Sequence, residues 1–232
     1  MRMKHVLLVL LVVLIWGLNF SVIKLGLREI PPILLCALRF LFVAFPAVFF
    51  LEKPGSSWKL VILYGLATFA IQFSLLFLGM KFGVSAGIAS LILQCHVIFT
   101  VQIAYFVLKE PIFTRHIIGG MVAFLGIGVV ASNMGGDVSV SGFVLILGAA
   151  LSLAVGNVAS KKINSNQVIN LIVWGSLFAS VPLLLASYLF ENSQWSIEAI
   201  KNTSLTATLC IFFLVYPVTF FGFSAWSFLL NK

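Results

Sequence analysis

The chain has 232 residues, of which 62% are hydrophobic and only 9% are charged, and its mean hydropathy is +1.18. This composition excludes an ordinary soluble globular domain and indicates an integral membrane protein embedded in a lipid bilayer. The net charge of +8 would favour a nucleic-acid partner in a soluble protein. We expect no nucleic acid here, because basic residues in a membrane protein mark its orientation instead.

Apolar segments long enough to cross a bilayer recur along the whole chain. A hydrocarbon core of roughly 30 Å needs about 20 apolar residues of helix. The sequence therefore predicts an all-α, polytopic transmembrane helical bundle of about eight spans: 6–23, 33–51, 60–80, 84–108, 117–133, 140–160, 168–190 and 205–230. The fifth span is short, and its glycines predict close packing on neighbouring helices: Gly119, Gly120, Gly126 and Gly128.

The first two spans each contain polar groups at unexpected depth. Arg2 and Lys4 precede the first span as they would precede a secretory signal, but its length predicts a retained helix that ends with Asn19 and Lys24. In the second span, Arg39 lies about two turns from the outer end. Since a charge at mid-bilayer costs about 2.5 to 3.5 kcal/mol, Arg39 should face protein or water. Its guanidinium either pairs with a substrate carboxylate or reaches the outer interface.

The third and fourth spans hold two glutamines and a histidine. Four small or polar residues of the fourth span recur at steps of four, three and four and share one helical stripe: Gly83, Gly87, Ser90 and Gln94. The stripe predicts close packing of another helix, with Gln94 as a cavity amide at its deep end and Gln72 at similar depth. His96 titrates near neutral pH and is a candidate for proton coupling, although we favour a hydrogen bond to a neighbouring helix.

The sixth span repeats the arrangement of the first. LSLAVGNVASKK (151–162) places Asn157 five residues before Lys162, as Asn19 precedes Lys24. The two copies are five spans apart and so face opposite sides of the membrane, which predicts an inverted repeat of the kind found in secondary transporters. The two asparagines either bind a substrate at paired gate positions or clamp neighbouring helices. Trp174, deep in the seventh span, belongs either to a cavity or to the core.

Several motifs resemble the EamA family of the drug/metabolite transporter superfamily: WGLNFSVIKLGL, PPILLCALRF, FGVSAGIASLILQ, KEP before a glycine-rich span, and GNVASKK. The resemblance covers essentially the whole chain. It implies two inverted repeats of five helices around a cavity, here residues 1–134 with five spans and 140–232 with three, so the second repeat lacks two helices. It also implies export of amino-acid-like metabolites, such as cysteine or O-acetylserine, across the bacterial inner membrane by alternating access. A homodimer could supply the missing cavity wall.

Other classes of protein fit the residues less well. The pattern G-x-S-x-G at 83–87 lacks the strand-to-helix turn and the acidic partner of a hydrolase nucleophile, so we expect no enzyme. Cys36, Cys95 and Cys210 lie in apolar spans, and neither metal-ligand spacing nor a cofactor motif is present. The remaining alternatives are a truncated protein without transport activity and a channel-like subunit, although no ring of charges indicates a selectivity filter.

The charge distribution predicts that both termini are cytoplasmic. Nine Lys or Arg residues then lie inside, Arg2, Lys4, Lys53, Lys59, Lys109, Arg115, Lys161, Lys162 and Lys232, and four outside, Lys24, Arg28, Lys81 and Lys201. A single cysteine introduced at Ser57 should therefore react with an impermeant reagent only after lysis, while one at Asp137 should react in whole cells. The opposite labelling pattern would show that the orientation is reversed.

Overall fold

The computed structural model describes residues 3–132, 139–163, 167–191 and 204–230. Within these ranges every regular element is a helix, and seven helices are long and apolar enough to cross a membrane. The predicted all-α, polytopic bundle is confirmed. Several residues used for the orientation lie outside the described residues: Arg2, Asp137, Lys201 and Lys232.

The seven membrane-crossing helices match seven of the eight predicted spans, and we number them accordingly. Spans 1 to 4 are α1 (Met3–Gly26), α2 with η1 (Pro32–Ala44 and Ala47–Phe49), α3–η2–α4 (Trp58–Gly65, Leu66–Ile71 and Gln72–Lys81) and α5–α6 (Ala86–Leu93 and His96–Leu108). Spans 6 to 8 are α8 (Val140–Ile163), α9 (Val168–Phe190) and α11–η4–α12 (Leu205–Phe213, Leu214–Phe221 and Gly222–Leu230).

The chain forms two compact units, and each is described by itself. Unit 1 comprises Met1–Gly55 and Ser165–Lys232, and unit 2 comprises Ser56–Asn164. Spans 1, 2, 7 and 8 therefore belong to unit 1, whereas spans 3, 4 and 6 belong to unit 2 together with α7 (Thr114–Ser132). Each unit thus takes helices from both predicted repeats, 1–134 and 140–232, so the units do not follow the two halves of the chain.

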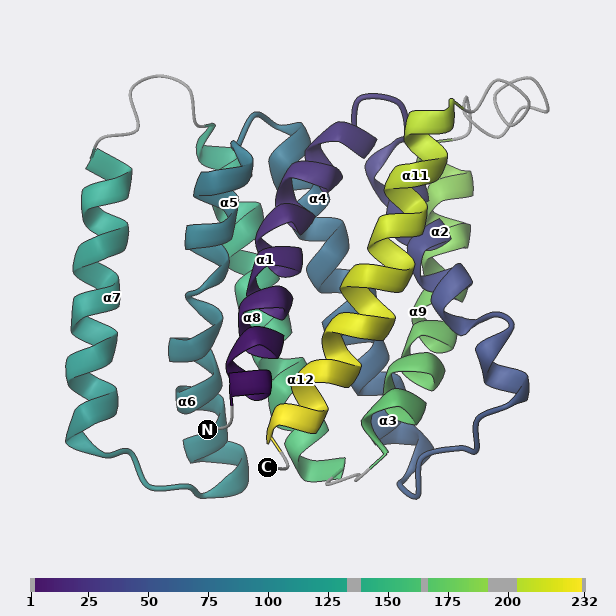
Figure 1. Cartoon of the computed structure of the whole chain (residues 1–232). Helices are drawn as coiled ribbons and strands as arrows, with labels where there is room; N and C mark the ends of the chain where they lie inside the picture. The colour runs from purple at the N-terminus through teal and green to yellow at the C-terminus, as the bar shows by residue number, and fades with distance from the viewer. Residues whose placement is uncertain (1–2, 133–138, 164–166, 192–203, 231–232) are drawn as a thin grey trace. The chain divides into compact units, whose positions relative to one another are not determined.

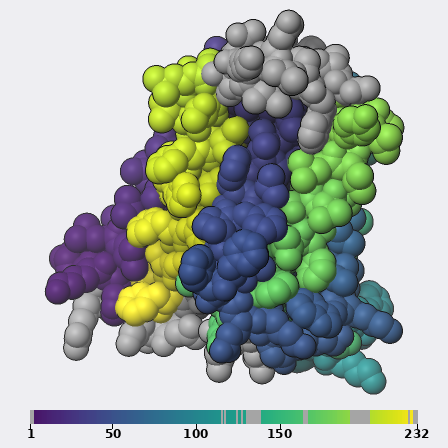
Figure 2. Space-filling view, turned by 90° about the vertical axis from the view of Figure 1, so that its right-hand side faces the viewer, coloured from purple at the N-terminus to yellow at the C-terminus, as the bar shows by residue number. Residues whose placement is uncertain are grey.

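Unit 1 is arranged around α2. This helix packs along α9 and also contacts span 8, which in turn packs on α1 (Figure 1). Figure 2 shows span 8 (yellow) against α2 (blue), with α9 (green) on the other side of α2. The first turn of α1 and the last turn of α12 lie at the same end of the unit, because the rings of His5 and Phe228 are 6.1 Å apart.

Hydrogen bonds to or next to α9 hold both ends of the segment that runs from the start of α2 to Glu52. The Glu191 carboxylate, just after α9, accepts the backbone N–H groups of Ile33 (2.9 Å) and Leu34 (2.8 Å) at the start of α2. A carboxylate is stabilised there by the helix dipole and supplies acceptors that the first turn lacks. At the other end, the Trp174 indole N–H donates to the Glu52 carbonyl at 3.1 Å. The two helices are therefore held as a pair.

The α-helical part of span 2 is shorter than predicted. It ends at Ala44, and Phe45 has an extended backbone with φ −106° and ψ 133°. The following residue is Pro46, whose ring disfavours an α conformation in the residue before it. Pro182, by contrast, lies inside α9 without ending that helix. A proline at similar depth therefore has different consequences in spans 2 and 7.

Unit 2 is arranged around α8, which contacts span 3 and both halves of span 4. The backbones of α4 and α8 approach closely where two glycines meet. A Cβ atom added to Gly79 would lie 2.9 Å from the Gly142 carbonyl oxygen, and one added to Gly142 would lie 2.9 Å from the Gly79 oxygen. Only glycine fits at this crossing, as is common between transmembrane helices.

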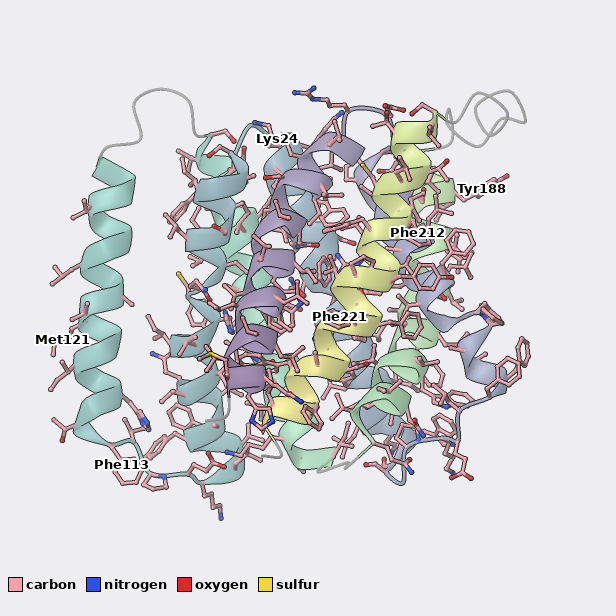
Figure 3. The ribbon with its side chains drawn as sticks, viewed as in Figure 1. Lys24, Phe113, Met121, Tyr188, Phe212 and Phe221 are labelled. Carbon is pink, nitrogen blue, oxygen red and sulfur yellow. The ribbon has the colours of Figure 1, made fainter. Side chains whose placement is uncertain are left out.

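The predicted close packing of the fifth span is wrong. The segment forms the helix α7, but it is not among the seven candidate spans in the described residues. A Cβ atom at any of its four glycines, Gly119, Gly120, Gly126 and Gly128, would meet nothing within 4 Å. Its large side chains are exposed, including Met121 at 55% and Leu125 at 71%, and Met121 projects from α7 in Figure 3. The glycines therefore do not place a neighbour against α7.

The predicted stripe of span 4 is also wrong in part. Gly83 lies in the turn before α5 with φ 100°, a left-handed conformation that favours glycine, so it is not on the helix. A Cβ atom at Gly87 would meet nothing within 4 Å. The helix is then interrupted at Gln94 and Cys95, between α5 and α6. Close packing instead occurs at Gly79, one turn before Gly83.

Replacing Gly79 by alanine should destabilise the protein. The new methyl group would lie 2.5 Å from Ile146 Cγ1 and 2.9 Å from a backbone oxygen that cannot rotate away. Overpacking of this kind costs about 1 to 3 kcal/mol. The measurement is thermal unfolding of the purified protein in detergent, with Gly87→Ala as the matched control because that glycine has open space. Equal melting temperatures for the two variants would contradict the close crossing of α4 and α8.

Candidate functional site

Spans 3 and 8 each contain a π-helical segment, η2 and η4. A π turn adds a residue to the helix, changes its hydrogen-bond pattern and is frequently found at functional sites. The two segments share a tripeptide of a small aliphatic residue, Thr and Phe. It is Ala67-Thr68-Phe69 in η2 and Val218-Thr219-Phe220 in η4. Both threonines are buried.

A side chain from another span binds the backbone of each π segment. In unit 2, the Ser152 hydroxyl on α8 donates to the Ala67 carbonyl at 2.8 Å. In unit 1, the Trp16 indole N–H on α1 donates to the Val218 carbonyl at 3.3 Å. The accepting carbonyl belongs in both cases to the residue before the threonine. Each donor therefore adds a side-chain hydrogen bond to a backbone that departs from the α-helical ladder.

Arg39 is buried in unit 1, with 1% of its surface exposed. Its Nη2 atom donates to the Thr219 hydroxyl at 3.1 Å, and that hydroxyl donates to the Leu214 carbonyl at 2.8 Å. The guanidinium thus lies against the π segment of span 8 and does not reach the surface of the protein. It is a fixed cationic group beside an irregular stretch of helix.

Asn19 is also buried, at 7% exposure, on the face of α1 that includes Val12 and Ile23. Its Oδ1 atom accepts no hydrogen bond from any residue that the structure describes. The same face includes Trp16, whose Nε1 atom would be 2.5 Å from a Cβ atom at Gly222. Asn19 therefore faces span 8, and its acceptor lacks a donor there.

Trp174 lies in unit 1 but does not join Asn19 and Arg39 through any contact described here. It is half-buried, and its indole N–H points to two backbone carbonyls, those of Leu51 at 3.3 Å and Glu52 at 3.1 Å. The Asn170 amide donates to the same Glu52 carbonyl at 3.0 Å. Trp174 therefore fastens α9 to the end of span 2, and a role in substrate binding stays a prediction.

In unit 2, two of the motifs quoted above meet. The Asn157 amide on α8 donates to the Thr100 hydroxyl on α6 at 3.3 Å. One turn further, Lys161 forms an ion pair with Glu110 of the KEP motif at 2.7 Å. These two side chains are 61% and 41% exposed, so the ion pair adds little stability. The Asn157 amide thus links α8 to span 4, and its role in substrate binding stays a prediction.

His96 follows the interruption in span 4. Its Nδ1 atom lies 2.9 Å from the Leu93 carbonyl oxygen and must carry the hydrogen, since a carbonyl only accepts. The favoured hydrogen bond to a neighbouring helix is not the one found, because Leu93 belongs to the same span. Gln94, at the interruption, is exposed, and Gln72, just after η2, is buried at 2% exposure.

The structure divides the predicted site residues between the two units. Asn19, Arg39 and Trp174 lie in unit 1, whereas the other four, Gln72, Gln94, His96 and Asn157, lie in unit 2. Thr219 was not among the predicted site residues, although its Thr-Phe pair in span 8 also occurs in span 3. Among the described residues, no group of three or more His, Cys, Asp or Glu side chains could hold a metal ion.

Comparisons with known proteins identify similar sequences. A model of the EamA-like transporter family matches residues 3–132. Over 238 residues the chain is 40% identical to a protein of Salmonella typhimurium (strain LT2) and 37% identical to one of Escherichia coli (strain K12), both named "Probable amino-acid metabolite efflux pump". These alignments cover 100% of this chain and 80% of each relative. An uncharacterized transporter of Bacillus subtilis (strain 168) is 28% identical over 94% of this chain and 72% of the relative.

Replacing Thr219 by valine should destabilise unit 1. Valine keeps the shape but removes the acceptor for Arg39, and loss of a hydrogen bond to a buried charged group costs about 1.5 to 3 kcal/mol. Thr219→Ser, which keeps a hydroxyl, should recover most of the loss in thermal stability in detergent. The control is Thr208→Val on the same span, whose hydroxyl is exposed and donates to the Ser204 carbonyl at 3.1 Å. A Thr219→Val protein as stable as this control would contradict the contact with Arg39.

Proposed function

Because the chain belongs to the EamA-like transporter family, we propose that it exports small polar metabolites that resemble amino acids, such as cysteine or O-acetylserine. Export proceeds by alternating access across the bacterial inner membrane. The two relatives named as amino-acid metabolite efflux pumps support this substrate class. The observation that carries the proposal is Arg39, a buried cation held in a defined position within a membrane span.

Arg39 suits a substrate that bears a carboxylate. A charged side chain within the bilayer is costly and marks a functional position by default. The guanidinium presents a planar fork of donors that matches a carboxylate, and it donates to the neutral Thr219 hydroxyl. A substrate carboxylate would add a charge-assisted hydrogen bond to this group. Amino-acid-like metabolites carry such a carboxylate.

Inverted repeats, residues 1–134 and 140–232, are part of the proposal. The shared tripeptides pair span 3 with span 8, and the Asn–Lys pairs match span 1 with span 6. Within unit 1, span 1 donates to the π segment of span 8 through Trp16. Within unit 2, span 6 donates to the π segment of span 3 through Ser152. Span 1 thus contacts span 8 as span 6 contacts span 3, and this correspondence supports a duplicated fold and an alternating-access transporter.

The orientation and the remaining candidates complete the proposal. Both termini are cytoplasmic, which agrees with the common end at which α1 starts and α12 finishes. Gln72, Gln94 and Asn157 are substrate contacts or gate residues of unit 2, and Trp174 has that role in unit 1. His96 is the candidate for proton coupling, because its Nε2 atom is not used by the hydrogen bond to Leu93.

Transport by the purified protein tests the function. Proteoliposomes loaded with unlabelled L-cysteine under reducing conditions should take up labelled L-cysteine faster than empty ones. A carrier gives saturable flux that is stimulated by exchange, whereas a channel-like subunit gives flux without exchange stimulation. Flux no higher than in protein-free liposomes would refute the proposal for this substrate.

Replacing Arg39 by alanine should lower transport far more than protein abundance. Loss of a charge-assisted contact costs about 1.5 to 3 kcal/mol, or roughly tenfold or more in affinity. The measurement is the concentration of L-cysteine that gives half-maximal exchange, normalised to the reconstituted protein. Arg28→Ala is the matched control, because Arg28 is an exposed arginine between α1 and α2. Equal affinity in both variants would reduce Arg39 to a structural residue.

A further inference from the structure

Three elements of unit 1 come together around the π segment of span 8. Both α1 and α2 contact η4. The helices α1 and α2 also approach each other at the end of α1. A Cβ atom added to Gly26 there would lie 3.0 Å from Leu35 Cδ2 on α2. We call these elements the α1–α2–η4 group. It contains both Asn19 and Arg39, the two predicted site residues whose buried polar groups face span 8.

Two contacts fix the level at which Asn19 meets span 8. Trp16 donates to Val218, and a Cβ atom at Gly26 would lie 3.6 Å from Cys210 Cβ. Asn19 shares this face of α1 and lies between those two positions, so it faces the stretch of span 8 between Cys210 and Val218. That stretch includes Leu214, whose carbonyl accepts the Thr219 hydroxyl that also holds Arg39. Asn19 and Arg39 therefore approach η4 from different helices at neighbouring levels.

The Asn19 Oδ1 atom needs a hydrogen-bond donor. A buried acceptor without a partner costs about 1 to 3 kcal/mol, so such atoms in a native protein call for an explanation. An amide oxygen can accept but not donate, whereas an ammonium group offers three donors and no acceptor. The Arg39 guanidinium of the same α1–α2–η4 group attracts carboxylates, whereas the Asn19 amide oxygen attracts hydrogen-bond donors such as an ammonium group. The pair matches the two charged ends of an amino acid.

We propose that Asn19 and Arg39 form a site for zwitterions, in which Arg39 binds the α-carboxylate and Asn19 Oδ1 accepts from the α-ammonium. This inference rests on the proposed function and narrows its substrate class. Free α-amino acids are accepted, while the corresponding hydroxy acids and amines lack one of the two contacts and bind weakly. Since Asn19 and Arg39 are only 7% and 1% exposed, substrate reaches them only when the α1–α2–η4 group opens. Binding and opening are thereby linked.

Three related compounds test the site in proteoliposomes: L-cysteine, 3-mercaptolactate, which lacks the ammonium, and cysteamine, which lacks the carboxylate. Each is measured as a competitor of labelled L-cysteine exchange. In the parent protein, loss of either contact should weaken competition roughly tenfold or more. Asn19→Leu should weaken competition by L-cysteine but not competition by 3-mercaptolactate. The parent protein's preference for L-cysteine over 3-mercaptolactate should therefore disappear. Asn19→Asp, which keeps an acceptor, should retain that preference.

The outcomes separate this inference from the proposed function. Active exchange of L-cysteine that depends on Arg39, together with an unchanged ammonium preference in Asn19→Leu, overturns the zwitterion site and leaves the exporter intact. A parent protein that binds L-cysteine and 3-mercaptolactate equally well overturns it without any variant, so the test does not depend on whether Asn19→Leu folds. Absence of L-cysteine exchange in the parent refutes the proposed function, and this inference with it.

Discussion

The bilayer demands an internal partner for every backbone polar group, because lipid offers no hydrogen bonds. A regular helix meets this demand alone, but spans 3, 4 and 8 are irregular near their middles. A side chain meets the backbone at each of these places. Ser152 donates to η2, Trp16 donates to η4, and His96 donates to the carbonyl of Leu93. The first two contacts join different spans, span 6 to span 3 and span 1 to span 8, whereas the third lies within span 4.

The candidate site depends on the same irregularity. Thr219 reaches the Leu214 carbonyl from five residues along the chain, a spacing that belongs to a π turn rather than an α-helical one. Its hydroxyl is then placed to accept from Arg39 on α2. The Arg39 guanidinium is thus positioned by span 8, where the hydrogen bonds of the helix are π-helical rather than α-helical. Local irregularity of the backbone and the placement of a buried charge are two aspects of one arrangement.

The sequence predicted the spans well and their interruptions poorly, for a physical reason. Bilayer thickness sets the length of an apolar run, so the ends of α8 and α9 fall close to prediction. A π turn depends on partners far away in sequence, such as Ser152 for Ala67, and leaves no local pattern. The spacing of Gly83 and Gln94 suggested one straight helix because a period assumes that the helix is continuous.

Polar candidates were predictable to different degrees. Arg39 and Asn19 stand out because charges and amides are rare in apolar runs, and both are buried. Thr219 does not stand out, since a single threonine is compatible with a core, a lipid-facing or a binding position. Its importance depends on Arg39, which is 180 residues away. The partner of the Asn157 amide, Thr100, lies on α6, so spacing within α8 could not reveal it.

Fastening at both ends changes the mechanical character of span 2. Alone, this segment would bend where α2 stops at Ala44, because Phe45 is extended. The Glu191 carboxylate accepts hydrogen bonds from the start of α2, while the Trp174 indole N–H donates to the Glu52 carbonyl beyond the bend. The long helix α9 therefore spans the bend and stabilises the segments of span 2 on either side of it. Because both ends of the segment from α2 to Glu52 are hydrogen-bonded to residues in or next to α9, we expect Arg39 and α9 to move together when the transporter changes conformation.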